Sequence, residues 1–132
     1  ASCVALAQAG AVVFAVGRDQ DRGLKLVQEV CLAAGREGAC SFHSADLRTK
    51  EPCDVVVELA TEKHGRVDAL VHAAGVFPTA SLADTTDDIW RSTMQIHADA
   101  FFYLCRSLAP GMIQRKNGVL LAIASNYGLV GA

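Results

Sequence analysis

The sequence lacks the features that mark several specialised classes of protein. No apolar run approaches the roughly 18 residues that a membrane-spanning helix needs, and the start Ala-Ser-Cys-Val shows neither the basic head nor the apolar stretch of a signal peptide. An excess of one charge is also missing, because 12 Lys and Arg face 14 Asp and Glu, for a net charge of −2. We therefore expect neither a membrane nor a nucleic acid as a partner.

The cysteines show no pattern that indicates a metal site or a disulfide framework. An odd, scattered set without a CxxC pair is typical of small buried hydrophobes in a reducing compartment. The sequence therefore predicts a cytoplasmic protein and no metal site. The five cysteines are Cys3, Cys31, Cys40, Cys53 and Cys105.

The composition that is present is that of a globular domain. The chain has 132 residues, of which 52% are hydrophobic and 20% charged, so it can bury a core. No internal repeat or interdomain linker interrupts it. We expect residues 1–132 to form a single, partial nucleotide-binding domain.

Apolar strand candidates alternate with helix candidates along the chain. Each crossover is long enough to join parallel strands, with helices on the faces of the sheet. This order predicts an α/β fold, a doubly wound, Rossmann-like parallel sheet in three α/β/α layers. The expected strands are 11–16, 39–44, 67–72 and 119–124, and the expected helices are 2–9, 20–34, 50–64 and a long one after 85.

Spacing and capping residues give the helices further detail. Asp19 and Thr49 are predicted to cap the second and third helices, and Pro110-Gly111 to kink the long one. The apolar spacing predicts two inward-facing sets: Leu24, Val27, Cys31 and Ala34, and then Val55, Val56, Leu59 and Ala60.

The first helix has no strand ahead of it and no glycine-rich turn, which a dinucleotide-binding sheet places before its first helix. We therefore expect a fragment, truncated at both ends, that lacks the first strand and the C-terminal part of the fold. That strand would lie between 11–16 and 67–72, so exposed edges should make the isolated chain prone to aggregation.

The apolar run Val119–Ala124 stops at the hydroxyl of Ser125. Ligands of open parallel sheets bind beyond the carboxyl ends of the strands, so Ser125 is placed to contact a substrate. The alternative is a serine that satisfies backbone groups at the strand end.

Two further strand ends carry candidate cofactor residues. Arg18 follows strand 11–16, where an arginine accommodates a 2′-phosphate and an acid would hold a ribose hydroxyl. Asp46 could accept a hydrogen bond from an adenine amino group while Leu47 packs against the ring. The alternatives are that Arg18 is an exposed arginine in a turn and that Asp46 merely begins the turn before the next helix.

An ordered set of motifs resembles the short-chain dehydrogenase/reductase family. Leu-Val-His-Ala-Ala-Gly-Val at 70–76 is similar to that family's Leu-Val-Asn-Asn-Ala-Gly block. The similarity covers essentially the whole chain and is strongest to the ketoacyl-carrier-protein reductase type. The other motifs, in order, are Gly17-Arg18, Ala45-Asp46-Leu47, 65–68, Trp90, Phe101-Phe102, 108–112 and 118–125.

The resemblance implies a role for each of several residues. Ser125 matches the serine that binds the substrate carbonyl oxygen, and Ala73 and Gly75 lie in the block that borders the cofactor. His97 takes the place of an asparagine that holds a water in the proton relay, although it could instead face a polar cleft or a core gap. The family's Tyr-x-x-x-Lys pair lies beyond the last residue, and Tyr127 is not a substitute for it.

The resemblance also implies an activity. It predicts an oxidoreductase that prefers NADP(H) over NAD(H), acts on a small carbonyl or alcohol substrate and assembles as a homodimer or homotetramer. Without the tyrosine and lysine, the 132 residues alone should show little turnover. The alternative is a noncatalytic Rossmann-like binding or scaffold protein, which the departures at Ala73 and His97 favour.

Overall fold

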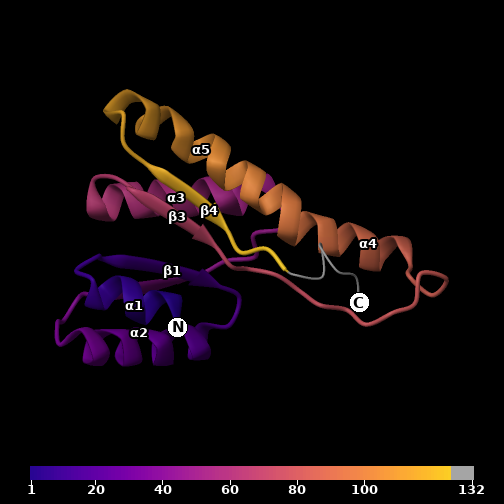
Figure 1. The fold of residues 1–132 in the computed structure, drawn as a ribbon, viewed down its shortest axis with the longest axis horizontal. Helices are drawn as coiled ribbons and strands as arrows, with labels where there is room; N and C mark the ends of the chain where they lie inside the picture. The colour runs from indigo at the N-terminus through magenta and orange to yellow at the C-terminus, as the bar shows by residue number, and fades with distance from the viewer. Residues whose placement is uncertain (126–132) are drawn as a thin grey trace. The chain divides into compact units, whose positions relative to one another are not determined.

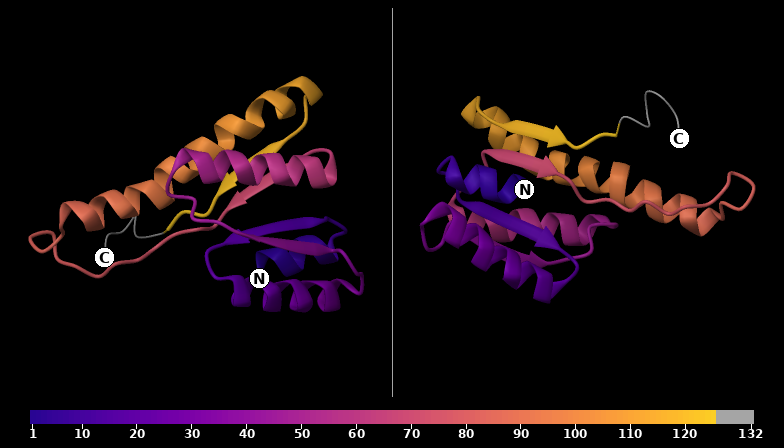
Figure 2. Two further views of the ribbon diagram at one scale, coloured as in Figure 1. Left: turned by 180° about the vertical axis from the view of Figure 1, so that it is seen from behind. Right: turned by 60° about the horizontal axis from the view of Figure 1, so that its bottom comes forward.

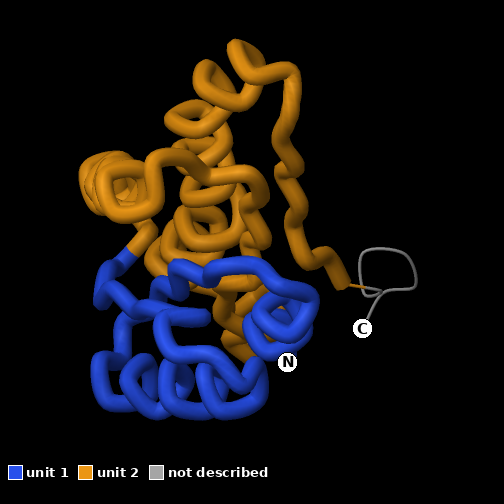
Figure 3. Tube along the Cα trace, turned by 90° about the vertical axis from the view of Figure 1, so that its left-hand side faces the viewer, with its two compact units in different colours: residues 1–46 blue, residues 47–132 orange. Residues whose placement is uncertain are grey.

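The computed structural model describes residues 1–125. It divides into two compact units, unit 1 with residues 1–46 and unit 2 with residues 47–132 (Figure 3). Each unit has its own pair of parallel strands and its own helices. They are described separately below.

Unit 1 is a parallel strand pair with two helices packed against it (Figure 1). The strands pair from Val13 opposite Cys40 to Gly17 opposite Ser44. Its elements are α1 (Ser2–Gln8), β1 (Val13–Gly17), α2 (Gln20–Ala34) and β2 (Cys40–Ser44). Its buried core consists of Ala7, Ala15, Val30, Ala39 and Cys40.

The buried face of α2 differs from the prediction at Leu24, which is 52% exposed. The neighbouring Gly23 is buried instead, because the ring of Phe42 occupies the space beside its Cα. A Cβ at Gly23 would lie 2.2 Å from that ring. The ring of Phe42 thus determines which face of α2 is buried, and Leu24 lies outside that face.

Unit 2 contains a second parallel pair, with Ala69 opposite Val119 and His72 opposite Ala122. Its elements are α3 (Lys50–His64), β3 (Ala69–His72), α4 (Asp87–Met94), the π-helical turn η1 (Gln95–Asp99), α5 (Ala100–Arg115) and β4 (Val119–Ala122). Its buried apolar residues include Leu47, Cys53, Val56, Ala60, Ile96, Ala100, Leu104, Leu108 and Met112.

Two predictions for α3 need correction. Val55 is 45% exposed, and Cys53 is buried in its place, so the inward face is rotated from the one predicted. Thr49 stands at the N-cap, but its side chain makes no capping hydrogen bond there. By contrast, Asp19 caps α2 as predicted and accepts a hydrogen bond from the Arg22 amide at 2.9 Å.

The long helical region is one rod of three segments, α4, η1 and α5 (Figures 1 and 2). Its irregularity lies in the π turn at 95–99, and α5 continues through Pro110 to Arg115. Two large aromatic side chains of the rod, Trp90 and Phe102, are more than half exposed. Smaller side chains of the rod form the core instead.

The fold is α/β and Rossmann-like, as predicted. The four strands of the described chain form two separate parallel pairs, β1–β2 and β3–β4, in accord with the expectation that β1 and β3 do not pair directly. Whether residues 1–132 act as a single domain remains a prediction. Within residues 1–125, no helix has the length and apolar character to cross a membrane.

Three helices end in the same hydrogen-bonded turn. After α1, the Ala11 amide donates to the Leu6 carbonyl and the Gly10 amide to the Ala7 carbonyl. This pattern requires a left-handed residue at its centre, for which glycine is best suited. Gly10 and Gly35 supply it after α1 and α2, but Lys116 supplies it after α5, with φ of 53°.

We predict that Lys116→Gly stabilises the chain by about 0.5–1 kcal/mol, because glycine removes the cost of a left-handed conformation. Urea unfolding of the protein that contains residues 1–132 with its flanking sequence measures the change in free energy. Gly35→Ala is the matched control and should be destabilising by a similar amount. A loss of stability in Lys116→Gly would contradict the assignment.

Candidate functional site

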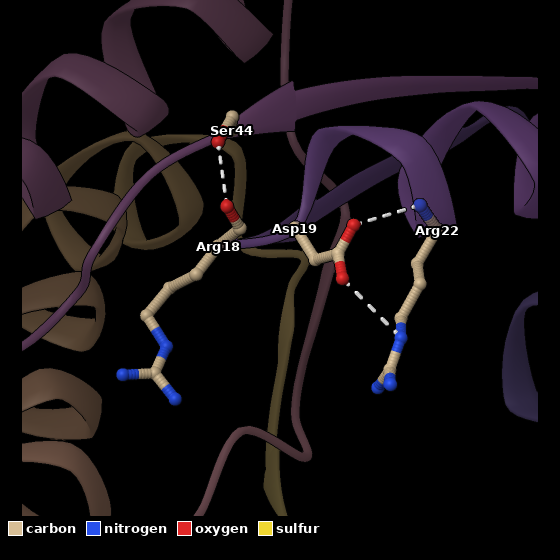
Figure 4. Close-up of polar contacts among 4 residues, drawn as sticks. All are labelled: Arg18, Asp19, Arg22 and Ser44. Carbon is tan, nitrogen blue, oxygen red and sulfur yellow. Dashed lines mark hydrogen bonds and ion pairs between the residues drawn. The ribbon is translucent and has the colours of Figure 1, made fainter.

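The carboxyl edge of unit 1 carries Arg18 and Asp46. Arg18 follows β1 directly, and Asp46 comes two residues after the end of β2. The Ser44 hydroxyl donates to the Arg18 carbonyl at 3.1 Å, and the Ala45 amide donates to the Gly17 carbonyl at 2.9 Å. These bonds fix both turns at the same edge, and the Arg18 side chain extends outward from it (Figure 4).

Asp19, the acid next to Arg18, is already engaged. One carboxylate oxygen accepts from the Arg22 amide, and the other lies 3.3 Å from Nε of the Arg22 guanidinium (Figure 4). An acid tied to its own helix is a poor partner for a ribose hydroxyl. The Arg18 guanidinium projects from this edge and is a cation of the kind that suits a phosphate (Figure 4).

The carboxyl edge of unit 2 brings together the segments that follow β3 and β4. The Ile123 amide donates to the His72 carbonyl at 2.9 Å, which extends the ladder one step past the strands. Residues 73–75 and 123–125 therefore leave the sheet at the same edge. Ala73, Gly75 and Ser125 are all exposed there.

His97 joins this edge from the helical rod. Its Nε2 lies 2.8 Å from the Val76 carbonyl oxygen and 3.1 Å from the Val76 amide nitrogen. A protonated Nε2 donates to the carbonyl, and an unprotonated Nε2 accepts from the amide. The ring also covers Gly75, where a Cβ would lie 2.4 Å from Cε1 of His97. The loop after β3 and the imidazole are therefore fitted to each other.

His72, the last residue of β3, is buried, at 5% exposure. Its Nε2–H donates to the Ile96 carbonyl at 3.0 Å, and its ring stacks at a tilt on Phe101, with 5.6 Å between centroids. Burial lowers the pKa of His72 below the ordinary 6.5, although the bond to Ile96 acts in the opposite direction. The polar group of His72 is thus bonded to the helical rod.

The predicted site residues fall into two groups, one in each unit. Ala73, Gly75, His97 and Ser125 lie in unit 2, whereas Arg18 and Asp46 lie in unit 1. Leu47, expected to pack on an adenine ring, is 7% exposed, and its carbonyl accepts from the Cys53 thiol. Tyr127 lies outside the described residues.

A polar link between α3 and α5 was not predicted. Asp54 accepts a hydrogen bond from the Ser107 hydroxyl at 2.5 Å and pairs with Lys50 one turn earlier on α3. The hydrogen bond from Lys50 lowers the pKa of the Asp54 carboxyl. The i, i+4 spacing of Lys50 and Asp54 is visible in the sequence, but nothing in it identifies Ser107 as the partner.

Comparisons with known proteins agree on one class. The family model described as short chain dehydrogenase matches residues 1–132. The 3-oxoacyl-acyl-carrier-protein reductase FabG of Thermotoga maritima is 28% identical over 131 residues, which cover 99% of this chain and 52% of the relative.

Solved structures give the same result. The L-sorbose reductase of Gluconobacter frateurii, in complex with NADPH and L-sorbose, is similar with a TM-score of 0.89 and 26% identity, over 99% of this chain and 50% of that one. A metagenomic short-chain oxidoreductase in complex with NADP has a TM-score of 0.84 and 28% identity, over 94% of this chain and 56% of that one. The chain spans about half the length of the curated relatives it matches.

We predict that the free energy of unfolding decreases as the pH falls from 8 toward 5. The pKa of His72 is lowered in the folded state, so as the pH falls below the ordinary pKa of 6.5 the unfolded chain takes up a proton that the folded chain does not. The unfolded state is therefore favoured at low pH. One such proton contributes a slope of at most about 1.4 kcal/mol per pH unit. Urea unfolding across this range measures it, and His72→Gln should flatten the profile. A profile that is equally steep in His72→Gln would argue against His72 as its source.

Proposed function

Because the chain belongs to the short-chain dehydrogenase family, we propose that it is part of an NADP(H)-dependent oxidoreductase that interconverts a small carbonyl compound and its alcohol. The observation that carries the proposal is the position of Ser125, exposed where the segments after β3 and β4 leave one sheet edge. Reduced nicotinamide, when bound, supplies the hydride for such a reaction.

Ser125 is proposed to bind the oxygen of the substrate carbonyl. A hydroxyl donor at that oxygen stabilises the negative charge that develops as hydride reaches the carbon. Ala73 and Gly75 are exposed and add no bulky side chain of their own to the same edge, which suits the approach of a flat ring. These features support the role of Ser125, and the alternative is a serine that only completes the strand end.

His97 is proposed to hold a place in the proton relay. Its Nε2 is engaged by the Val76 backbone, so Nδ1 is the nitrogen that remains to exchange a proton with water. The Val76 peptide offers both an acceptor and a donor to Nε2, and the ring therefore keeps its position in either tautomer. A relay residue needs this tolerance, because its protonation changes in each cycle.

The preference for NADP(H) is assigned to Arg18. The residues at this edge fit the cofactor: an outward guanidinium suits a 2′-phosphate, and the neighbouring acid, Asp19, is paired with Arg22. Asp46, at the same edge, remains the proposed acceptor for an adenine amino group. The NADPH and NADP named for two similar structures support the same preference for that class of cofactor.

We also propose a homo-oligomer, as a dimer or tetramer. The helical rod carries large apolar side chains at its surface, with Trp90 at 62% and Phe102 at 56% exposure. Exposed aromatic groups of this kind are enriched at protein interfaces.

The first test uses the protein that contains residues 1–132 with whatever flanking sequence its gene encodes. We expect Ser125→Ala to lower kcat for NADPH-dependent carbonyl reduction by about 100-fold or more, since an oxyanion donor is lost. Ser2→Ala, at an exposed serine of α1, is the control. Cofactor binding without turnover in the unmutated protein would favour the noncatalytic binding or scaffold alternative.

The second test replaces Arg18 with Asp in the same protein. The ratio of kcat/KM for NADPH to that for NADH should fall by about 10-fold or more, because a carboxylate repels the 2′-phosphate and accepts from a ribose hydroxyl. Lys25→Asp makes the same change of charge at an exposed position on α2 and should leave the ratio unaltered. An unchanged ratio in Arg18→Asp would remove the assignment.

A further inference from the structure

The π turn breaks the hydrogen-bond pattern of the helical rod next to His72. The Ala100 amide donates to the Gln95 carbonyl five residues back, whereas in an α-helix it would donate to the Ile96 carbonyl. The donor that approaches the Ile96 oxygen from outside the rod is Nε2–H of His72, at 3.0 Å. A side chain of the sheet thus supports the helical irregularity.

This bond fixes the chemical form of the His72 ring. A carbonyl oxygen only accepts, so Nε2 must carry a proton. Burial disfavours a second proton on Nδ1, and the ring is held neutral with its hydrogen on Nε2. The stacked ring of Phe101, from the first turn of α5, restricts its orientation further.

The next residue along the rod is His97, and its ring has little freedom. It must reach the Val76 backbone while lying over Gly75, with atoms as close as 2.4 Å to the position a Cβ would take there. Return of the π turn to regular α-helix would rotate the ring by a large part of a 100° step, since each residue turns the helix by about that angle. The contact with Val76 therefore depends on the irregular turn.

We propose that His72 is a positioning residue: its hydrogen bond to the Ile96 carbonyl holds the π turn, and the turn holds the His97 imidazole on the loop after β3. The inference rests on the proposed function insofar as His97 takes part in a proton relay. The placement of His97 itself rests only on the contacts described. Two histidines thus connect the rod to the sheet edge. His72 of β3 bonds to the Ile96 carbonyl of the rod, and His97 of the rod bonds to the Val76 backbone of the loop after β3.

The charged surroundings of His72 are simple. Of the titratable groups in the described part of the chain, His97 of η1 is the one whose charge acts on the ring, and a positive charge there disfavours protonation of His72. Its partner from η1 is the Ile96 carbonyl, and its partner from α5 is the apolar ring of Phe101. His72 therefore acts through hydrogen-bond donation, and an uncharged donor of the same reach should replace it.

The test is NMR spectroscopy of the protein that contains residues 1–132 with its flanking sequence, labelled with ¹⁵N-histidine and recorded at pH 7.5. In the unmutated chain, the ring nitrogens of His72 should show the Nε2–H tautomer alone. In His72→Met, which has no donor, the two ring-nitrogen resonances of His97 should converge toward their positions in the urea-denatured chain. In His72→Gln, which carries an amide donor at similar reach, they should stay near the unmutated positions.

His43→Leu is the matched control, because His43 lies in unit 1 and stacks on Phe14. It should leave the resonances of His97 unchanged. An Nδ1–H tautomer at His72 in the unmutated chain would overturn the proposal, whether or not the variants fold. So would His97 resonances that are unaltered in His72→Met, or that move equally in His72→Gln and His72→Met.

Failure of the relay and failure of the positioning are distinguishable. Replacement of His97 by Ala, with turnover measured in the protein with its flanking sequence, reports on the relay alone. Unchanged turnover there, together with resonances of His97 that follow residue 72, would remove the relay and leave the positioning role intact. Slower turnover in His97→Ala, together with His97 resonances that do not change when residue 72 is replaced, would support the relay and remove the positioning role.

Discussion

The parallel ladder between β3 and β4 is the constraint on which the candidate site depends. With His72 opposite Ala122 and the Ile123 amide bonded to the His72 carbonyl, both strands must release their following segments at one edge. Ser125 and the Ala73–Gly75 loop meet there because the strands run in the same direction, which an antiparallel pair would not allow. A one-residue slip of the register would turn every side chain of β4 to the opposite face and carry Ser125 away from this position.

Much of this organisation can be predicted from the sequence. Short apolar runs separated by capped helices are enough to indicate parallel strands, and Asp19 caps α2 as its position before that helix predicts. The positions of Arg18 and Ser125 at the sheet edges can be predicted because each residue comes just after the end of an apolar run in the sequence. Such features are local, since a few neighbouring residues determine them.

The exact buried faces are not local, and this is where the sequence misleads. Leu24 has the right spacing for a core residue, yet Gly23 is buried because Phe42, from a strand distant in the sequence, occupies that side of α2. Periodicity gives the width of an apolar face but cannot show which large side chain will press against it.

The π turn at 95–99 also has no signal in the sequence. One extra residue in a helical turn leaves the hydrophobic spacing on either side almost intact, and Pro110 is the more obvious place in the sequence for an irregularity. Its support, the hydrogen bond from His72 to Ile96, becomes visible only when β3 and the helical rod are placed side by side. A histidine at the end of a buried strand is the single hint that a polar partner lies nearby.

The fit of His97 over Gly75 has a consequence for how this protein can change. Because no side chain, even a methyl group, fits beneath the imidazole, the two positions form a linked pair. A mutation that adds bulk to the loop displaces the ring without altering its chemistry, whereas a smaller residue at 97 frees the loop to accept other amino acids. A change that adds a side chain at Gly75, whether in evolution or by design, therefore first requires a smaller residue at position 97.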